Sequence, residues 1–277
     1  MARKAVTMAI CYDFDGTLAP GNMQEHSFLP RLGVEPGDFW ARSRRLAEEQ
    51  DADEILAYMR LMIDLAREAK VPVRREDFLD LGAGLGFFPG VSSWFARING
   101  YARAKGVAIE HYIISSGLRE MVEGTSIARE FTKIYASGFM FDENGVARWP
   151  ALAINYTTKT QYLFRINKGT LDVSDNSLIN KYVPKEGRRI PFERMIYIGD
   201  GETDIPCFRL VKEEGGCSIA VYPKGRKGAR DRIEELVAGG RANLVAPADY
   251  EEGSLIDRGV KAIIDKLEAA SRIEAER

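Results

Sequence analysis

The 277-residue sequence predicts an α/β fold: a doubly wound, Rossmann-like parallel sheet that carries a helical insertion. Short apolar runs at 5–12, 107–114 and 194–199 are typical of strands buried on both faces of a sheet. Helical patterns separate these runs, so strands and helices alternate along the chain. Each run also ends in acids or hydroxyls next to glycine, and such strand ends share one crevice in a parallel sheet.

The first apolar run, 5–12, leads directly into Asp13, Asp15 and Gly16. Residues two apart in an extended chain point the same way, so both carboxylates can converge just beyond the strand. Two like charges about 4 Å apart repel by roughly 4 kcal/mol at a protein-surface dielectric, and a cation or a proton would relieve this repulsion. A turn that uses Asp and Gly for conformational reasons is the alternative interpretation.

Helical periodicity replaces strand patterning in the next part of the chain, most clearly at 38–70. Prolines and glycines between 72 and 90 interrupt this pattern before the strands resume. We therefore expect a catalytic core made of 1–20 and 88–277, and a helical cap made of 21–87 that is hinged at both ends.

The second apolar run follows an amphipathic helix at 92–105 and ends in Ser115, Ser116 and Gly117. A strand that ends in hydroxyls and a glycine before a helix offers O–H and N–H donors to an anion. Helix capping by either serine is the simpler alternative, and the two roles are compatible.

A lysine, Lys159, occupies an unusual place in the middle of the chain. A third strand is expected at 131–137 and a hairpin at 139–149, before a helix over 160–167 with Thr157 or Thr158 as its N-cap. Lys159 then lies in the first helical turn, where the helix dipole disfavours a cation. A negative group near Lys159 would explain its position, and an ordinary exposed lysine is the alternative interpretation.

The run at 194–199 again ends in acids, Asp200 and Asp204, ahead of a helix that extends to Val211. The remaining elements complete the alternation of strands and helices. They are strands at 217–222 and 243–246 and helices at 229–237 and 253–269.

The charge balance is nearly neutral, with 39 Lys and Arg against 41 Asp and Glu, so no nucleic-acid partner is expected. The basic run at 224–227 is interpreted as a solvated loop, and Arg42, Arg44 and Arg45 as a solvated helix face. No signal peptide and no apolar run of about 18 residues is visible, so we expect a cytoplasmic protein without a membrane partner. The sequence does not define the oligomeric state.

Several carboxylates gathered in one crevice favour a hard divalent cation, and Mg²⁺ also binds phosphate oxygens. The sequence resembles the D-x-D-G-T phosphatases of the haloacid dehalogenase-like superfamily along its whole length. DFDGT at 13–17 is similar to the first motif of that family, IISSG at 113–117 to the second, and GDGETD at 199–204 to the acidic fourth. The insertion at 21–87 stands where such proteins carry a helical cap.

The resemblance implies a phosphatase that forms an aspartyl-phosphate on Asp13, with Asp15 as general acid and base. It implies Mg²⁺ bound by Asp13, by the backbone carbonyl of Asp15 and by Asp200, with Asp204 in support. Ser115, or its neighbour Ser116, would hold a phosphoryl oxygen, and the phosphate-binding lysine would be Lys159, with Lys181 as the alternative.

A Mg²⁺-dependent phosphatase acting on a small phosphorylated metabolite is therefore the expected function. Two alternatives stay open: a phosphotransferase or mutase of the same fold, and a phosphate-binding regulatory protein with little turnover. The substrate would be selected by the cap, whose residues match no chemistry that identifies it.

Overall fold

The computed structural model describes residues 6–71 and 73–275, and in them seven strands form one sheet in the order β4-β3-β2-β1-β5-β6-β7. All neighbouring strands are parallel except β3 and β4, which form an antiparallel hairpin at one edge. The predicted α/β class with a parallel core sheet is confirmed. The strands are β1 (Val6–Tyr12), β2 (Val107–Leu118), β3 (Lys133–Phe141), β4 (Ala147–Leu152), β5 (Met195–Gly199), β6 (Cys217–Tyr222) and β7 (Leu244–Pro247).

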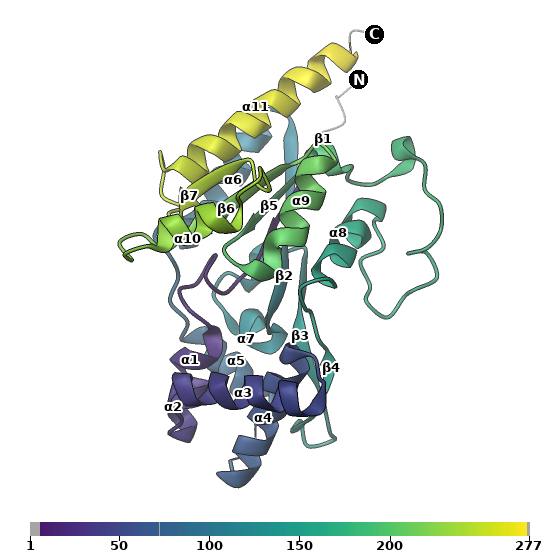
Figure 1. Cartoon of the computed structure of the whole chain (residues 1–277). Helices are drawn as coiled ribbons and strands as arrows, with labels where there is room; N and C mark the ends of the chain where they lie inside the picture. Colours follow the sequence, from purple (N-terminus) through teal and green to yellow (C-terminus); the bar gives the residue numbers. More distant parts are fainter. Residues whose placement is uncertain (1–5, 72, 276–277) are drawn as a thin grey trace.

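Helices cover both faces of this sheet (Figure 1). Trp94 and Phe95 belong to the buried cluster on one face, and Tyr162 and Phe208 belong to the cluster on the other. No helix in the described ranges has both the length and the apolar character needed to cross a membrane. On the first face lie α6 (Val91–Ala104), α7 (Arg119–Gly124) and α11 (Leu255–Ala275); on the second lie α8 (Lys159–Lys168), α9 (Ile205–Glu213) and α10 (Ala229–Leu236). Four single 3₁₀ turns are η1 (Ala128–Glu130), η2 (Lys185–Gly187), η3 (Phe192–Arg194) and η4 (Glu202–Asp204).

The chain between β1 and α6 forms helices that gather at one end of the sheet (Figure 1). The continuous periodicity of 38–70 becomes two helices, because Asp51 adopts a left-handed conformation with φ 48°. Asp53 then caps the second helix by accepting the backbone N–H groups of Ile55 and Leu56 at 3.0 and 3.1 Å. The helices are α1 (Met23–His26), α2 (Phe28–Leu32), α3 (Pro36–Gln50), α4 (Glu54–Glu68) and α5 (Arg75–Ala83).

The last of these helices, α5, lies directly against α7 of the core. A Cβ on Gly82 would collide with the backbone of Met121, and one on Gly124 would collide with the backbone of Leu79. Glycine at both positions therefore allows the two helix backbones to touch. Next to this contact, two backbone bonds join residues 73–75 to the tip of the β3–β4 hairpin, including Arg75 N–H to the Gly145 carbonyl at 3.0 Å.

Strand β2 is longer than the apolar run alone predicts. It continues through Ser115, Ser116 and Gly117 to Leu118, and its pairing with β3 shifts register between Ser115 and Leu118. The serines therefore lie on an irregular strand end, and helix α7 starts only at Arg119. Such irregularities are typical near active sites, where they redirect side chains.

A buried hydrogen-bond chain joins β1 to β2 and α6 behind the acidic strand end. Trp94 Nε1 donates to the Tyr12 hydroxyl at 2.8 Å, which in turn lies 3.0 Å from His111 Nδ1. The other imidazole nitrogen of His111 lies 3.0 Å from Asn99 Oδ1. A neutral imidazole protonated at Nε2 satisfies every partner of this chain.

Burial lowers the pKa of His111 from its ordinary value to about 3. In the unfolded chain His111 binds a proton as pH falls through about 6.5, whereas in the folded protein it stays neutral at that pH. The free energy of unfolding therefore decreases as pH falls below about 6.5. Between about pH 4 and 6, we expect His111 to lower the free energy of unfolding by close to 1.4 kcal/mol for each unit that the pH falls. Urea unfolding across this range should show a flatter pH dependence in His111→Gln than in wild type. Identical slopes would contradict a neutral, buried His111.

Candidate active site

The central strand β1 delivers two acids to the carboxyl edge of the sheet. The chain continues from β1 to β2 on one side, whereas β5 pairs with its other side, so the strand order switches beside β1. Crevices that bind ligands form at such switch points in open parallel sheets. Asp13 and Asp15 follow β1, Ser115 lies near the end of β2, and Asp200 follows β5.

The side chain of Lys159 reaches this edge from the first turn of α8. Its Nζ donates to Asp13 Oδ2 at 2.8 Å, to Asp204 Oδ1 at 2.7 Å and to Thr203 Oγ1 at 3.0 Å. Burial would lower the pKa of this fully buried lysine, but Asp13 and Asp204 raise the pKa above its usual range. The ammonium therefore stays charged between two carboxylates, which explains a cation at the start of a helix.

Lys181, the alternative lysine, lies elsewhere in the fold. It is exposed in the segment after α8, and its carbonyl accepts a hydrogen bond from Lys168 Nζ at 2.9 Å. Among the described residues it contributes neither to the cavity lining nor to the hydrogen bonds of Asp13. The geometry therefore favours Lys159 over Lys181.

The carboxylate of Asp204 is fully occupied by protein donors. Oδ1 accepts from Lys159 and from the Tyr197 hydroxyl at 2.6 Å, and Oδ2 accepts from the backbone N–H groups of Asp200 and Gly201 at 3.0 and 3.1 Å. Four donors use the acceptor capacity of both oxygens. Asp204 therefore positions Lys159 and the backbone that carries Asp200.

The carboxylates of Asp13 and Asp200 accept fewer protein hydrogen bonds than that of Asp204, so both retain unused acceptor positions. Ligand atoms of Asp13, Asp200 and Asp204 lie within 4.8 Å of one another. Burial raises the pKa of Asp13 although the ammonium of Lys159 opposes the shift, and burial beside Asp13 raises the pKa of Asp200. An added cation would hold both carboxylates ionised, so the donor set fits a hard divalent metal.

A glycine makes the approach of these acids sterically feasible. Gly16 has φ 73°, and a Cβ at this position would collide with the carboxylate of Asp200. The next residue, Thr17, donates through its hydroxyl to Asp200 Oδ1 at 3.4 Å. The residues that follow Asp15 therefore hold the side chain of Asp200.

Asp15 faces the start of helix α1. Its Oδ1 accepts the backbone N–H of Met23, the first residue of α1, at 3.0 Å. Burial, together with the charge of Asp13, raises the pKa of Asp15 well above its usual value. The protonated form is thereby stabilised, as a general acid requires.

The two serines of β2 differ in their hydrogen bonding. The Ser115 hydroxyl oxygen accepts the Gly117 N–H at 3.1 Å, whereas the Ser116 hydroxyl has no partner among the described atoms. Both serines line the same cavity as Asp13 and Asp15. The Ser116 carbonyl accepts from the Tyr58 hydroxyl at 2.7 Å, so a residue of α4 closes over this strand end.

A cavity of about 800 Å³ lies above the acids, and both the sheet end and the helices between β1 and α6 line it. Asn155 Nδ2 donates to Asp53 Oδ2 at 2.7 Å beside it and joins the start of α4 to the segment before α8. Lys159 lies beneath the lining, where it contacts Asp13. The part of the lining that comes from residues 20–58 consists of Pro20, Gly21, Asn22, Gln24, Trp40, Arg44, Ile55 and Tyr58.

Three basic residues that were interpreted as solvated also border the cavity. Arg226 and Lys227, assigned to a solvated loop, line this cavity, and so does Arg44, assigned to a solvated helix face. All three are exposed to solvent, but they face the site. A local sequence pattern cannot reveal this, because it does not show which side of a loop faces a cavity formed by another part of the chain.

Other contributors to the site were not predicted at all. Thr17, Tyr197 and Thr203 act through their hydroxyls on Asp200, Asp204 and Lys159. Thr17 and Thr203 lie inside the motifs DFDGT and GDGETD, so their positions carried a usable signal. Tyr197 is one of several apolar-looking residues of β5, and nothing in the sequence distinguishes it.

The fold and the site define a class: a Rossmann-like α/β protein with a lysine-bridged acidic site at the end of its central strand. Residues 10–209 match the sequence profile of the haloacid dehalogenase-like hydrolases, and the chain belongs to this family. The predicted resemblance to that family is thereby confirmed.

Known relatives extend along most of the chain. An uncharacterized protein of Borreliella burgdorferi is 30% identical over 274 residues, which cover 89% of this chain and 93% of that protein. A haloacid dehalogenase family hydrolase of Salmonella enterica serovar Typhi shares the fold with a TM-score of 0.56 at 20% identity, over 84% of this chain and 67% of that chain. A substrate-bound phosphoserine phosphatase has a TM-score of 0.55 at 16% identity, over 86% and 92% of the two chains.

Proposed function

We propose that the protein is a phosphatase that hydrolyses a small phosphate monoester through a phosphoryl group carried by Asp13. The observation that carries this proposal is the setting of Asp13. Lys159 Nζ donates to Asp13 Oδ2 at 2.8 Å, and the backbone N–H of Phe14 donates to Asp13 Oδ1 at 2.6 Å. The Asp13 side chain also lines the cavity. A fixed carboxylate beside a cation is suited to attack phosphorus, because the cation compensates the charge of the incoming phosphoryl group.

The proposed reaction has two steps. In the first, an Asp13 oxygen forms a bond to phosphorus, the bond from phosphorus to the ester oxygen breaks, and Asp15 gives its proton to that oxygen. In the second, Asp15 takes a proton from water, whose oxygen attacks phosphorus, and the aspartyl–phosphorus bond breaks to release phosphate. The raised pKa of Asp15 supports the donor role in the first step.

Ser115, Ser116 and Lys159 are the proposed partners of the phosphoryl oxygens. The Ser115 hydroxyl accepts from Gly117 and also forms a hydrogen bond that lowers the pKa of Asp13, so it lies beside the carboxylate that would carry the phosphoryl group. The Ser116 hydroxyl is uncommitted. Lys159 compensates negative charge from beneath the cavity.

We also propose Mg²⁺ as the cofactor, held by Asp13, Asp200 and the backbone carbonyl of Asp15, with Asp204 in support. When bound, the cation would offset negative charge on the phosphoryl group. We further propose that residues 21–87 act as the cap that shields the reaction from bulk water. The cap residues in the cavity lining and the Tyr58 contact with Ser116 support this role.

Hydrolysis of a panel of phosphate monoesters, measured as phosphate released in the presence of Mg²⁺, tests the proposed function. We expect turnover of at least some esters, with water rather than an added alcohol as the acceptor. Absence of phosphate release from every ester would contradict a phosphatase. Transfer to an added alcohol in preference to water would instead identify a phosphotransferase.

Chelation should abolish turnover, and added Mg²⁺ should restore it, because buried Asp13 and Asp200 repel each other without a cation. Binding of Mg²⁺ should also raise the melting temperature of the substrate-free protein, by an amount equivalent to about 2.7 kcal/mol at one hundred times the dissociation constant. Asp200→Asn should lose most of this stabilisation, and choline chloride at equal ionic strength serves as the control. Full activity in excess chelator would exclude the metal.

A further inference from the structure

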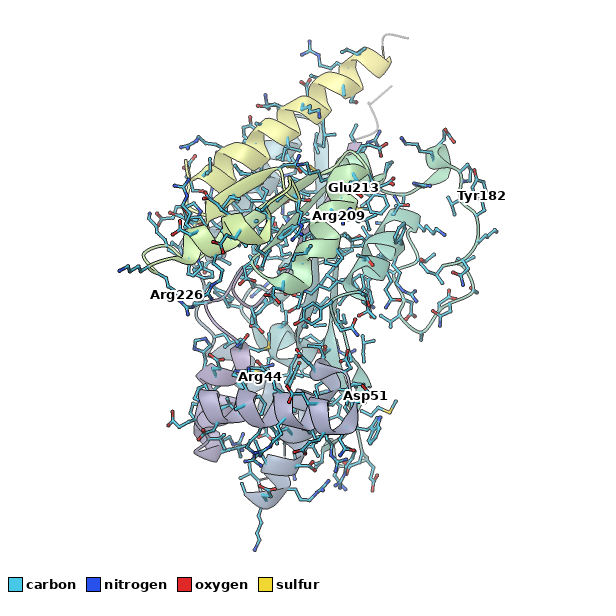
Figure 2. All side chains as sticks on the ribbon, in the orientation of Figure 1. Arg44, Asp51, Tyr182, Arg209, Glu213 and Arg226 are labelled. Carbon is cyan, nitrogen blue, oxygen red and sulfur yellow. The ribbon has the colours of Figure 1, made fainter. Side chains whose placement is uncertain are left out.

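Four cationic side chains line the cavity away from the acids. Arg44 comes from α3, Arg226 and Lys227 from the loop before α10, and Arg232 from α10 itself. Figure 2 shows Arg44 and Arg226 on opposite sides of the space between the cap helices and the core. Both parts of the molecule therefore direct positive charge into one cavity. We call these four side chains the basic rim.

The basic rim differs from neighbouring cations in its ion pairing. Arg45 pairs with Glu49 at 3.9 Å on α3, Lys224 pairs with Asp249 at 3.3 Å, and Arg230 pairs with Glu234 at 2.8 Å. These paired side chains are not part of the cavity lining. No carboxylate within the described ranges pairs at 4.0 Å or less with any member of the basic rim.

The acids of the cavity do not neutralise the basic rim. Asp13, Asp15 and Asp200 surround the proposed reaction centre, and Glu202 is the one further acid in the described lining. The cavity thus has two regions: a reaction centre that takes one phosphoryl group, and a second region with an excess of unpaired positive charge. Unpaired guanidinium groups suit planar or tetrahedral oxyanions, to which they donate two hydrogen bonds at once.

We propose that the substrate carries a second anionic group, a phosphate or a carboxylate, which the basic rim binds while Asp13 attacks the first phosphate. This inference rests on the proposed phosphatase function and specifies its substrate class as bis-anionic phosphate esters. The volume of about 800 Å³ supports it, because pockets of about 300–1,000 Å³ enclose whole small molecules rather than one phosphate. Contacts to both Arg44 and Arg226 would join cap and core across the bound molecule.

A ladder of synthetic substrates tests the proposal directly. Each member is an alkane chain with a phosphate ester at one end and a hydroxyl, a carboxylate or a second phosphate at the other, in short, medium and long versions. We expect kcat/KM for the best bis-anionic member to exceed that of its hydroxyl counterpart by about tenfold or more. The carboxylate and phosphate arms show which anion the basic rim prefers. This preference should shrink as salt rises from about 0.05 to about 0.5 M, because exposed charges are screened.

Matched substitutions identify the residues responsible. Arg226→Gln, Arg232→Gln and Arg44→Gln should each lower kcat/KM for the bis-anionic substrate by about five- to twentyfold, through KM, and leave the hydroxyl-ended substrate within about twofold. The controls Lys224→Gln, Arg230→Gln and Arg45→Gln remove the same charge from the same elements outside the cavity. They should leave the preference unchanged, which separates a local contact from the net charge of the protein.

Binding to the Asp13→Asn variant provides a readout that needs no turnover. Titration calorimetry should show the bisphosphate binding about tenfold more tightly than the monophosphate, with the difference lost when Arg226→Gln is added. Turnover without any preference for a second anion would overturn the inference and leave the phosphatase proposal intact. A binding preference without turnover of any ester would support the basic rim and overturn the phosphatase proposal.

Discussion

Asp13→Asn should abolish hydrolysis, with kcat lowered by a factor on the order of 10⁴ or more. An amide cannot form the phosphoryl ester that the proposed first step requires, and it also removes the carboxylate partner of Lys159 at 2.8 Å. Phosphate release from p-nitrophenyl phosphate, followed in stopped-flow and steady-state assays, measures the effect. Circular dichroism and thermal melting confirm that the variant is folded. A rate near that of wild type would show that Asp13 is not the nucleophile.

Asp15→Asn is the matched comparison, since Asp15 follows Asp13 by two residues and has a different proposed role. The variant should lose about 10²- to 10⁴-fold in turnover, because general acid and base catalysis is removed while the nucleophile remains. An aryl ester, whose leaving group needs little protonation, should still phosphorylate Asp13. We therefore expect a burst of one equivalent of nitrophenol followed by slow turnover. Absence of a burst together with complete inactivity would show that phosphorylation of Asp13 itself requires Asp15, even with an aryl leaving group.

Lys159→Ala should cause the largest loss of stability and should also remove activity. It deletes the buried ammonium that donates to Asp13 and Asp204 and leaves two carboxylates buried without it. Breaking a buried ion pair by removing one partner costs about 3–5 kcal/mol. Chemical unfolding in chelator gives the free energy, and phosphate release with Mg²⁺ gives the activity. Added Mg²⁺ should recover part of the stability but not the activity.

Lys181→Ala is the control for this experiment. Lys181 is exposed, and its backbone carbonyl, rather than its ammonium, accepts the hydrogen bond from Lys168 Nζ. Surface substitutions of this type usually change the free energy of unfolding by less than about 0.5 kcal/mol. A larger loss of activity in Lys181→Ala than in Lys159→Ala would reverse the assignment of the phosphate-binding lysine.

Short-range sequence patterns predicted the parts of the molecule that depend on local chemistry. Apolar runs beside Asp13, Ser115 and Asp200 predicted parallel strands, and the structure contains β1, β2 and β5 there. The convergence of these residues could be inferred, because the carboxyl ends of parallel strands lie at one edge of a sheet. The position of Lys159 at a helix start was a usable signal, because the dipole makes a cation unfavourable there without nearby acids.

Features that depend on tertiary contacts could not be predicted in this way. The Tyr197 hydroxyl supports Asp204, but tyrosine is an ordinary strand residue and its bond forms only after folding. Arg226 and Arg45 look alike in the sequence, yet one lines the cavity and the other pairs with Glu49. Which face of a loop or helix meets the cavity is decided by how the helices of 21–87 pack over the sheet.

The contact between α5 and α7 limits how the proposed cap could be exchanged between relatives. Gly82 and Gly124 allow the two backbones to touch, and Arg75 bonds to the hairpin tip at Gly145. A chimera that replaces 21–87 alone would place the helix of another protein against Gly124 and against the β3–β4 hairpin. Neither surface is complementary to that helix. The unit that recombination can transfer intact is therefore larger than the insertion, and it includes α7 and the β3–β4 hairpin.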